Sequence, residues 1–113
     1  MKNLLLIPIF NFSFLLFNCL AQQPGWEIIP SGTTQELNSI FFYDYEVGFA
    51  VGDSGTVIKS IDSGKTWQSL QTPTTFNLND LYMFHRDTLV VVGNSGTIFF
   101  TPDGGSSWYS TML

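Results

Sequence analysis

Apolar residues along this chain come in short runs separated by polar, glycine-containing turns, and no run has the spacing of a helix. Eight runs are rich in β-branched or aromatic residues, which predicts strands. They span residues 37–43, 47–51, 56–60, 66–70, 78–84, 89–92, 97–101 and 107–111. Short strands joined by frequent tight turns are typical of an all-β fold.

The pattern repeats at an interval of 41 residues. Trp26, Trp67 and Trp108 lie at this spacing, and the two units align without a gap. The agreement extends to apolar positions, for example Val51 with Val92. A repeat of about 40–45 residues is the length of one four-stranded propeller blade. The chain is therefore expected to form two such blades.

A tight hairpin turn is predicted between the second and third strands of each unit. Its sequence is GDSG in the first unit and GNSG in the second. Glycine adopts positive φ readily, and Asp or Asn tolerates it next best. We assign a structural role to the turn residues Gly52, Asp53, Gly55, Gly93, Asn94 and Gly96. The GDSG sequence also resembles the nucleophile loop of trypsin-like proteases, but those enzymes need a His upstream of the Ser, and the only histidine here, His85, lies downstream.

A second motif joins the third and fourth strands and reads SIDSGKTW in the first unit and TPDGGSSW in the second. The Asp carboxylate is expected to accept hydrogen bonds from backbone N–H groups a few residues on. The central Gly adopts a conformation that a Cβ resists, and the Trp covers the hairpin. The structural residues of the two motifs are Ser60, Asp62, Gly64, Thr66, Trp67, Thr101, Asp103, Gly105, Ser107 and Trp108.

These motifs resemble the Asp box, or BNR repeat, of sialidase-like β-propellers. The full unit is similar to the repeat of photosystem II stability and assembly factors, and the resemblance covers Trp26 to Leu113. It implies a partial β-propeller with two four-stranded antiparallel blades, at residues 37–70 and 78–113, and a link at 71–77. It also implies one extra N-terminal outer strand, with its link, at residues 26–36. In that family the Asp box is a folding device on the outer rim, so no catalytic role is expected for it.

Residues 1–21 are predicted to be a secretory signal peptide. Lys2 supplies a positive start, an apolar stretch follows, and Ala21 is a small residue at the expected cleavage point. The alternative is a lipoprotein anchored at Cys19. Either prediction exports the protein to the periplasm, the cell surface or the medium, and the membrane is contacted only through this segment. After cleavage at Ala21 the chain contains no cysteine, which excludes disulfides.

Charge and composition exclude several functions. The chain has a formal net charge of −5 and four basic residues, so a basic stripe for nucleic acid cannot form. Sialidases bind the substrate carboxylate with three arginines, whereas the chain has only Arg86. A lone His and scattered carboxylates lack the spacing of metal ligands. We expect no cofactor, no metal site and no catalytic residue.

A possible contact surface is the loop between the first and second strands of each unit. Paired loop carboxylates such as Asp44 and Glu46 resemble a glycosidase acid and base, but such pairs are more often solvated. Aromatic residues, Phe41 and Tyr82 among them, could stack on sugars, although packing between blades explains them more simply. The candidate contact-loop residues are Tyr43, Asp44, Tyr45, Glu46, Phe84, His85 and Arg86.

Ring closure leaves two architectures open. A propeller needs about 4–8 blades, whereas this chain supplies two. We expect a truncated member of a larger propeller, and the alternative is a short chain that forms a ring from several copies. The favoured function is an exported, non-enzymatic scaffold for a protein partner. The alternatives are a glycan-binding, lectin-like oligomer and a remnant of a sialidase-like glycoside hydrolase.

Overall fold

The computed structural model describes residues 27–110, and its regular elements there are strands and two 3₁₀ turns. The strands are β2 (Leu37–Phe42), β3 (Gly48–Gly52), β4 (Thr56–Ser60), β5 (Gln68–Leu70), β6 (Leu78–Met83), β7 (Leu89–Gly93), β8 (Ile98–Thr101) and β9 (Tyr109–Ser110). The all-β prediction is confirmed. No helix within 27–110 is long and apolar enough to cross a bilayer. The predicted signal peptide lies outside the described residues.

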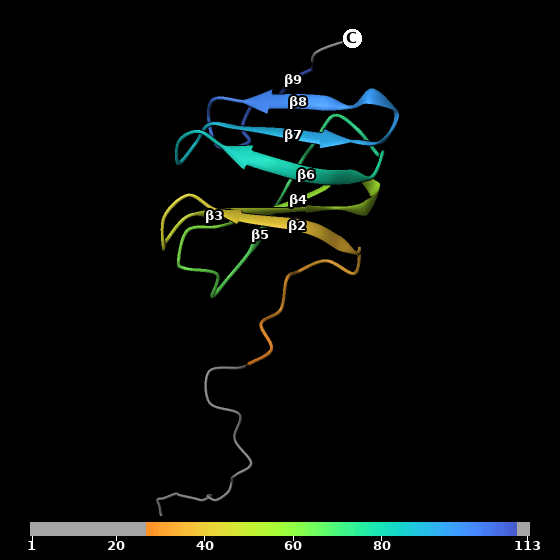
Figure 1. Ribbon diagram of the computed structural model, residues 1–113. Coiled ribbons are helices and arrows are strands. Elements are labelled where there is room, and N and C mark those ends of the chain that lie inside the picture. The colour runs from red at the N-terminus through yellow and green to blue at the C-terminus, as the bar shows by residue number, and fades with distance from the viewer. Residues whose placement is uncertain (1–26, 111–113) are drawn as a thin grey trace, which may run out of the picture.

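The strands form two four-stranded antiparallel sheets, each in sequence order. We call β2–β5 blade 1 and β6–β9 blade 2. The two blades have the same register, including a β-bulge after the first residue of β2 and of β6. Figure 1 shows the sheets stacked face to face, with blade 2 on blade 1. This confirms the prediction that each 41-residue unit folds as one blade.

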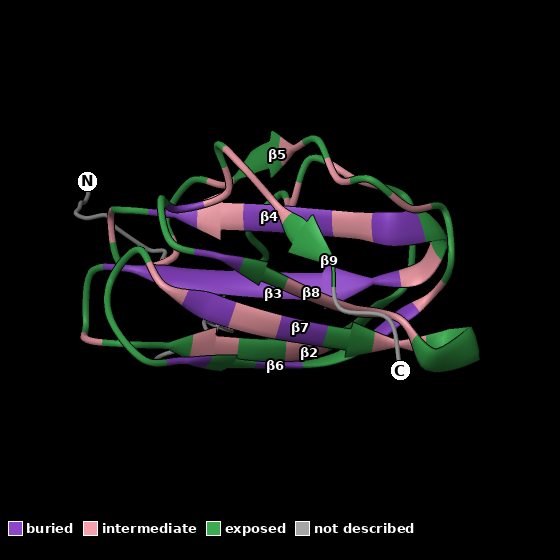
Figure 2. Cartoon of the chain, turned by 90° about the horizontal axis from the view of Figure 1, so that it is seen from above, coloured by how far each residue is buried: buried purple, intermediate pink, exposed green. Residues whose placement is uncertain are grey.

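The core lies between the blades. Side chains of β3 and β4, such as Phe49 and Val51, share one buried cluster with side chains of β6 and β7, such as Leu78 and Leu89. Figure 2 shows β3 as the most continuously buried strand, while β5 and β9 are largely exposed. Each blade is only one sheet thick. The face of blade 1 that contains Phe49 and Val51 is buried by the packing of blade 2 against it.

The predicted outer strand at Trp26–Ile29 does not form. Glu27, Ile28 and Ile29 lie outside any strand, and Trp26 lies outside the described residues. An outer strand forms by pairing with the third strand of its own blade, as β5 pairs with β4. Residues 27–110 contain no third strand of a preceding blade. This segment consequently has no edge to pair with, and the side chain of Ile28 is almost fully exposed.

The fourth strands begin two residues later than predicted, at Gln68 and Tyr109. Thr66 and Ser107, where the strands were expected to start, are held by the aspartates of their turns. The backbone therefore joins the sheet only after the Asp-box turn is complete. Thr111, the predicted end of the last strand, lies outside the described residues.

The hairpin turns after β3 and β7 differ from the prediction in one detail. Positive φ falls on Ser54 and Gly55 of the first turn, rather than on Asp53. Asp53 instead accepts a hydrogen bond on its carboxylate from the Asn38 side-chain amide, at 2.9 Å. The same pair in the second turn is Asn79 with Asn94. Position 53 or 94 therefore needs a side-chain acceptor, which both Asp and Asn provide.

The link between the blades, residues 71–77, packs on the first of these turns. Thr72 donates its hydroxyl hydrogen bond to the Gly55 carbonyl oxygen at 2.7 Å. A Cβ at Gly55 would overlap the carbonyl group of Thr74, so only glycine allows the link to approach this closely. The matching glycine of the second turn, Gly96, has nothing within 4 Å of such a Cβ.

Gly55→Ala is expected to destabilise the fold much more than the matched change Gly96→Ala. The two glycines have φ of 72° and 74°, so the backbone strain is the same in both variants, on the order of 1 kcal/mol. Only at Gly55 does the added methyl group also collide with the link, at a further cost of about 1–3 kcal/mol. Denaturant unfolding in dilute solution measures both losses. Equal losses would show that the link does not seat on this turn.

Candidate functional site

The Asp-box turn of blade 1 is held together by one carboxylate. Asp62 accepts hydrogen bonds from the Thr66 amide at 2.9 Å, from the Thr66 hydroxyl at 2.5 Å and from the Ser60 hydroxyl at 2.8 Å. Ser60 in turn accepts a hydrogen bond from the Gly64 amide at 2.8 Å. The predicted closure of this turn by Asp62 is what the geometry shows. The side chains act as a brace for the backbone and leave no reacting group free.

Blade 2 repeats this network at the same positions. Asp103 accepts from the Ser107 amide and hydroxyl at 2.8 and 2.7 Å, and from the Thr101 hydroxyl at 2.9 Å. The Gly105 amide donates to Thr101 at 2.9 Å. The two boxes are therefore structurally equivalent within each blade.

The two tryptophans of the boxes differ in what they bind. Trp67 donates its indole N–H to Gly64 of its own turn, at 3.0 Å. Trp108 donates instead to the carbonyl oxygen of Gln71, in the link between blades, at 2.9 Å. Leu70 of β5 also lies against Gly105. The Asp box of blade 2 thus contacts the link and blade 1. The box of blade 1 has no preceding blade within residues 27–110 with which to make the same contact.

Hydrogen bonding controls the ionisation of both aspartates. The Thr66 hydroxyl, the Thr66 amide and the Ser60 hydroxyl lower the pKa of Asp62 from 3.8 to about 2. The Ser107 hydroxyl and amide lower the pKa of Asp103 in the same way. Both groups are therefore ionised at neutral pH, which suits a hydrogen-bond acceptor and not a general acid.

The predicted contact loops lie at the same end of the molecule as the Asp boxes. The amide of Ser63 donates to the Glu46 carbonyl oxygen at 2.9 Å. The amide of Gly104 likewise donates to the Asp87 carbonyl oxygen at 2.7 Å. Arg86 of blade 2 reaches across to blade 1, 3.5 Å from the carboxylates of both Asp44 and Glu46. The structure thus brings the charged residues of the two predicted loops together.

Asp44 and Glu46 are not arranged as a catalytic acid and base. Backbone hydrogen bonds from Val47 and Glu46 are the main reason that the pKa of Asp44 is lowered. Asp44 therefore shows the opposite of the raised pKa that a general acid requires. Both carboxylates also face Arg86. Within residues 27–110 no group of three or more His, Cys, Asp or Glu residues could hold a metal ion.

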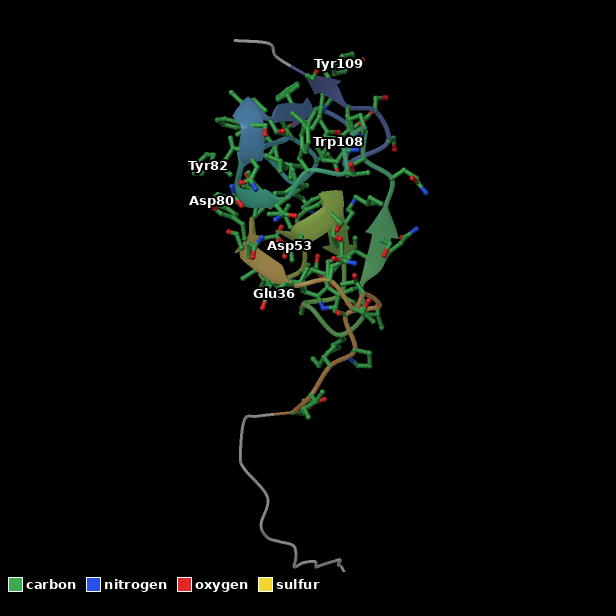
Figure 3. The ribbon with its side chains drawn as sticks, turned by 90° about the vertical axis from the view of Figure 1, so that its right-hand side faces the viewer. Glu36, Asp53, Asp80, Tyr82, Trp108 and Tyr109 are labelled. Atoms are coloured by element: carbon green, nitrogen blue, oxygen red, sulfur yellow. The ribbon has the colours of Figure 1, made fainter. Side chains whose placement is uncertain are left out.

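An aromatic row runs along the first strands of the two blades, and we define it as Phe41, Tyr82 and Phe84. The ring centroids of Phe41 and Tyr82 are 5.3 Å apart, and those of Tyr82 and Phe84 are 5.1 Å apart, both edge to face. Tyr43 and His85 form a separate tilted pair, with ring centroids 6.2 Å apart. Tyr82 and Phe84 are each about half exposed. Figure 3 shows Tyr82 at the edge formed by β2 and β6.

Tyr45 is more exposed than Tyr43 and Phe84 of the predicted loops, at 81%. It stands apart from the pairs made by Tyr43 with His85 and by Arg86 with the two carboxylates. The loops therefore contain one ordered group, which ties the blades together, and one free aromatic side chain. Their role in binding stays a prediction.

Several contacts between the blades escaped the sequence analysis. Ser39 donates to Asp80 at 2.8 Å, and the side chain of Asn38 donates to the Leu78 carbonyl oxygen at 2.9 Å. Ser39 and Asp80 occupy the same position of successive repeats. The repeat could have indicated them, because equivalent positions of neighbouring blades lie close together. The residue types gave no such signal.

Comparison with known proteins gives a single family. The family model described as photosynthesis system II assembly factor YCF48 matches residues 19–113. No match was found among curated proteins. The matched range includes both blades and both Asp boxes.

Two solved structures resemble this chain. One, described as YCF48 bound to D1 peptide, has a TM-score of 0.71 and 29% identity, over 83% of this chain and 31% of that one. The other, YCF48 from Cyanidioschyzon merolae, has a TM-score of 0.64 and 24% identity, over 75% of this chain and 29% of that one. This chain thus spans about a third of the length of either. The likeness confirms that its two sheets are blades of a partial β-propeller.

Asp62→Asn is expected to change how stability depends on pH. A carboxyl group whose pKa is lowered by folding stabilises the fold above its ordinary pKa, and the contribution disappears as the pH falls through the folded-state pKa. For Asp62 that window runs from about pH 4 to about pH 2. The variant should be less stable than wild type near pH 7, and its stability should fall less steeply across the window. Unfolding curves measured at several pH values test this.

The control is Asp53→Asn, which makes the same chemical change in a turn where the second unit already has Asn94. This variant should keep wild-type stability near pH 7. If the stability of Asp62→Asn fell in parallel with that of wild type between pH 4 and pH 2, the Asp box would not be the brace described here.

Proposed function

We propose, since this chain belongs to the family of the photosynthesis system II assembly factor YCF48, that it is a non-enzymatic scaffold that binds a protein partner. One relative with the same blades was solved with a D1 peptide bound, which supports a polypeptide as the class of ligand. The partner of this chain is proposed to be an extended segment of an exported protein. The scaffold holds that segment while a larger complex assembles.

The observation that carries this proposal is the aromatic row. Its three rings are already packed edge to face, so little side-chain freedom remains to be lost on binding. Half of the surface of Tyr82 and Phe84 is still open to solvent. Ordered, partly exposed aromatic side chains are the residues that most often dominate binding energy at protein interfaces.

The charges around the row indicate which segments suit it. The only arginine is 3.5 Å from both Asp44 and Glu46, so its charge is balanced within the chain. The chain carries a net charge of −5, which repels acidic segments. We therefore propose a segment with apolar or aromatic side chains and neutral or basic charge. The glycan-binding and glycoside-hydrolase alternatives have no observation in their favour.

We also propose that the working unit contains more blades than these two. The outward faces of both blades expose apolar side chains, such as Ile40 and Val92, that blade-to-blade packing buries elsewhere in the same chain. The aromatic row would then continue along the first strands of the additional blades. A partner segment would contact several equivalent positions in succession.

The binding proposal predicts that Tyr82→Ser weakens peptide binding at least about tenfold, which is about 1.4 kcal/mol. Tyr109→Ser is the matched control, because Tyr109 is similarly exposed but lies on β9, the outer strand of blade 2. The probes are a D1 peptide and extended peptides selected from a displayed library on the wild-type chain. Fluorescence anisotropy gives the affinities. If no peptide binds wild type, or if both variants lose affinity equally, the aromatic row is not the binding surface.

We further propose that the chain is exported. Protein recovered from an exporting host should begin at Gln22, as intact mass spectrometry would show. A start at Cys19 with the added mass of acyl chains would establish the lipoprotein alternative. Recovery of the whole chain starting at Met1 from the exported fraction would contradict both forms of processing.

A further inference from the structure

Each blade has two apolar faces, which we name by what they contact. The front face of blade 1 contains Phe49, Val51 and Val57, all of them almost completely buried. It packs against the back face of blade 2, which contains Leu78, Leu81 and Met83 and is equally buried. This contact is the interface between the blades.

The same faces recur on the two outer sides, where part of each is exposed. By the 41-residue repeat, the back face of blade 1 includes Leu37, Ile40 and Phe42. On this face, Ala50 and Ile58 are nevertheless buried. Ile40 is 59% exposed, whereas its counterpart Leu81 is 6% exposed. On the front face of blade 2, Val92 is 38% exposed, whereas its counterpart Val51 is fully buried. The molecule therefore exposes a back face on blade 1 and a front face on blade 2, the same two types of face that pack together between its blades.

The outer sides also carry the groups that would form the polar part of such an interface. Within the chain, Thr72 of the link donates to Gly55 of the turn. The segment before blade 1 is equivalent to that link and folds in the same way, since Ser31 donates to the Thr33 carbonyl oxygen at 3.2 Å, as Thr72 does to Thr74. The glycine equivalent to Gly55 is Gly96, and a Cβ added there would have no neighbour within 4 Å.

We propose that this chain associates head to tail with a second copy of itself, through a repetition of its internal interface. The front face of blade 2 in one copy packs on the back face of blade 1 in the next. The Ser31 hydroxyl of the second copy donates to the Gly96 carbonyl oxygen of the first. Each exposed face is thus covered by a face of the type that already packs on its counterpart inside the chain.

The segment before blade 1 does not obstruct this contact. A strand at residues 27–29 would compete with β9 of the neighbouring copy for the outer position of blade 2. Glu27 and Ile28 form no strand, so they are free to turn away from it. This inference does not rest on the proposed binding of a partner protein.

Salt should affect the association little. The internal interface includes ion pairs of Lys59 with Asp87 and of Arg86 with Asp44. At the equivalent positions between copies, Lys59 is replaced by Phe100 and Arg86 by Tyr45. Exposed ion pairs contribute little to stability, whereas apolar burial contributes most of it. The association is thus expected to persist in high salt.

A head-to-tail contact makes either a closed ring or an open filament, depending on its rotation. Closed propellers contain about 4–8 blades. With two blades from each copy, the expected product is a discrete ring of two, three or four copies. This product has a defined mass, which distinguishes it from aggregation.

The test uses two interface variants and a control. Val92→Glu places a charge on the front face, and Ile40→Glu places one on the back face. Phe100→Glu, also partly exposed on the front face, replaces Val92→Glu if that variant fails to fold. The control is Ile61→Glu. Ile61 is 69% exposed. Its counterpart Pro102 is exposed even though blade 1 packs on the back face of blade 2, so Ile61 should also stay exposed when a second copy packs on blade 1.

Light scattering of the purified protein, as processed by its host, is expected to show a discrete oligomer for wild type and for Ile61→Glu. Val92→Glu and Ile40→Glu should each be monomeric, with an unchanged circular dichroism spectrum. An equal mixture of these two should form a heterodimer and nothing larger, because each variant retains one intact face. A monomeric wild type, a mixture without heterodimer, or variants with the wild-type mass would each overturn the proposal.

Discussion

The packing of one blade on the next is the constraint from which the rest of the structure follows. A single sheet of this kind has apolar side chains on both faces, and residues 27–110 contain no α-helix to cover them. Blade 1 therefore buries Phe49 and Val51 only because blade 2 presents Leu78 and Leu81 to them. The Asp box of blade 2, the link and the turn at Gly55 all contribute to this contact.

The Asp box has a different task in each blade. Within a blade, its carboxylate braces the turn between the third and fourth strands. Between blades, Trp108 binds the Gln71 carbonyl oxygen and Leu70 packs on Gly105. The second set of contacts requires a preceding blade, which explains why Trp67 bonds within its own turn instead. The Asp box thus stabilises its own turn, and it also binds the preceding blade where one is present. The first strands take no part in these contacts, so the aromatic row on them stays accessible.

Much of the fold could be predicted from the 41-residue repeat, because turn glycines, Asp-box residues and apolar strands recur in register. The repeat could not show that a strand at residues 27–29 would lack a partner, and these residues form no strand in the structure. Nor could residue types show that positive φ falls on Ser54 and not on Asp53. The candidate loops join the first and second strands as predicted, yet the pairing of Arg86 with Asp44 across the blades depends on the stacking of the blades. The aromatic row likewise follows from packing, since Phe41 and Tyr82 are distant in sequence.

The central claim is that the two blades stabilise each other as a single unit. Native-state hydrogen exchange tests it most directly, through the amides of Val51 and Val57 in blade 1 and of Val90 and Val91 in blade 2. If the claim holds, the free energies of opening of all four amides converge on one value as denaturant is added, and Leu81→Ala lowers that value for both blades. If the amides of one blade open at a separate, lower free energy, and Leu81→Ala leaves blade 1 unchanged, the blades are independent and the account is wrong.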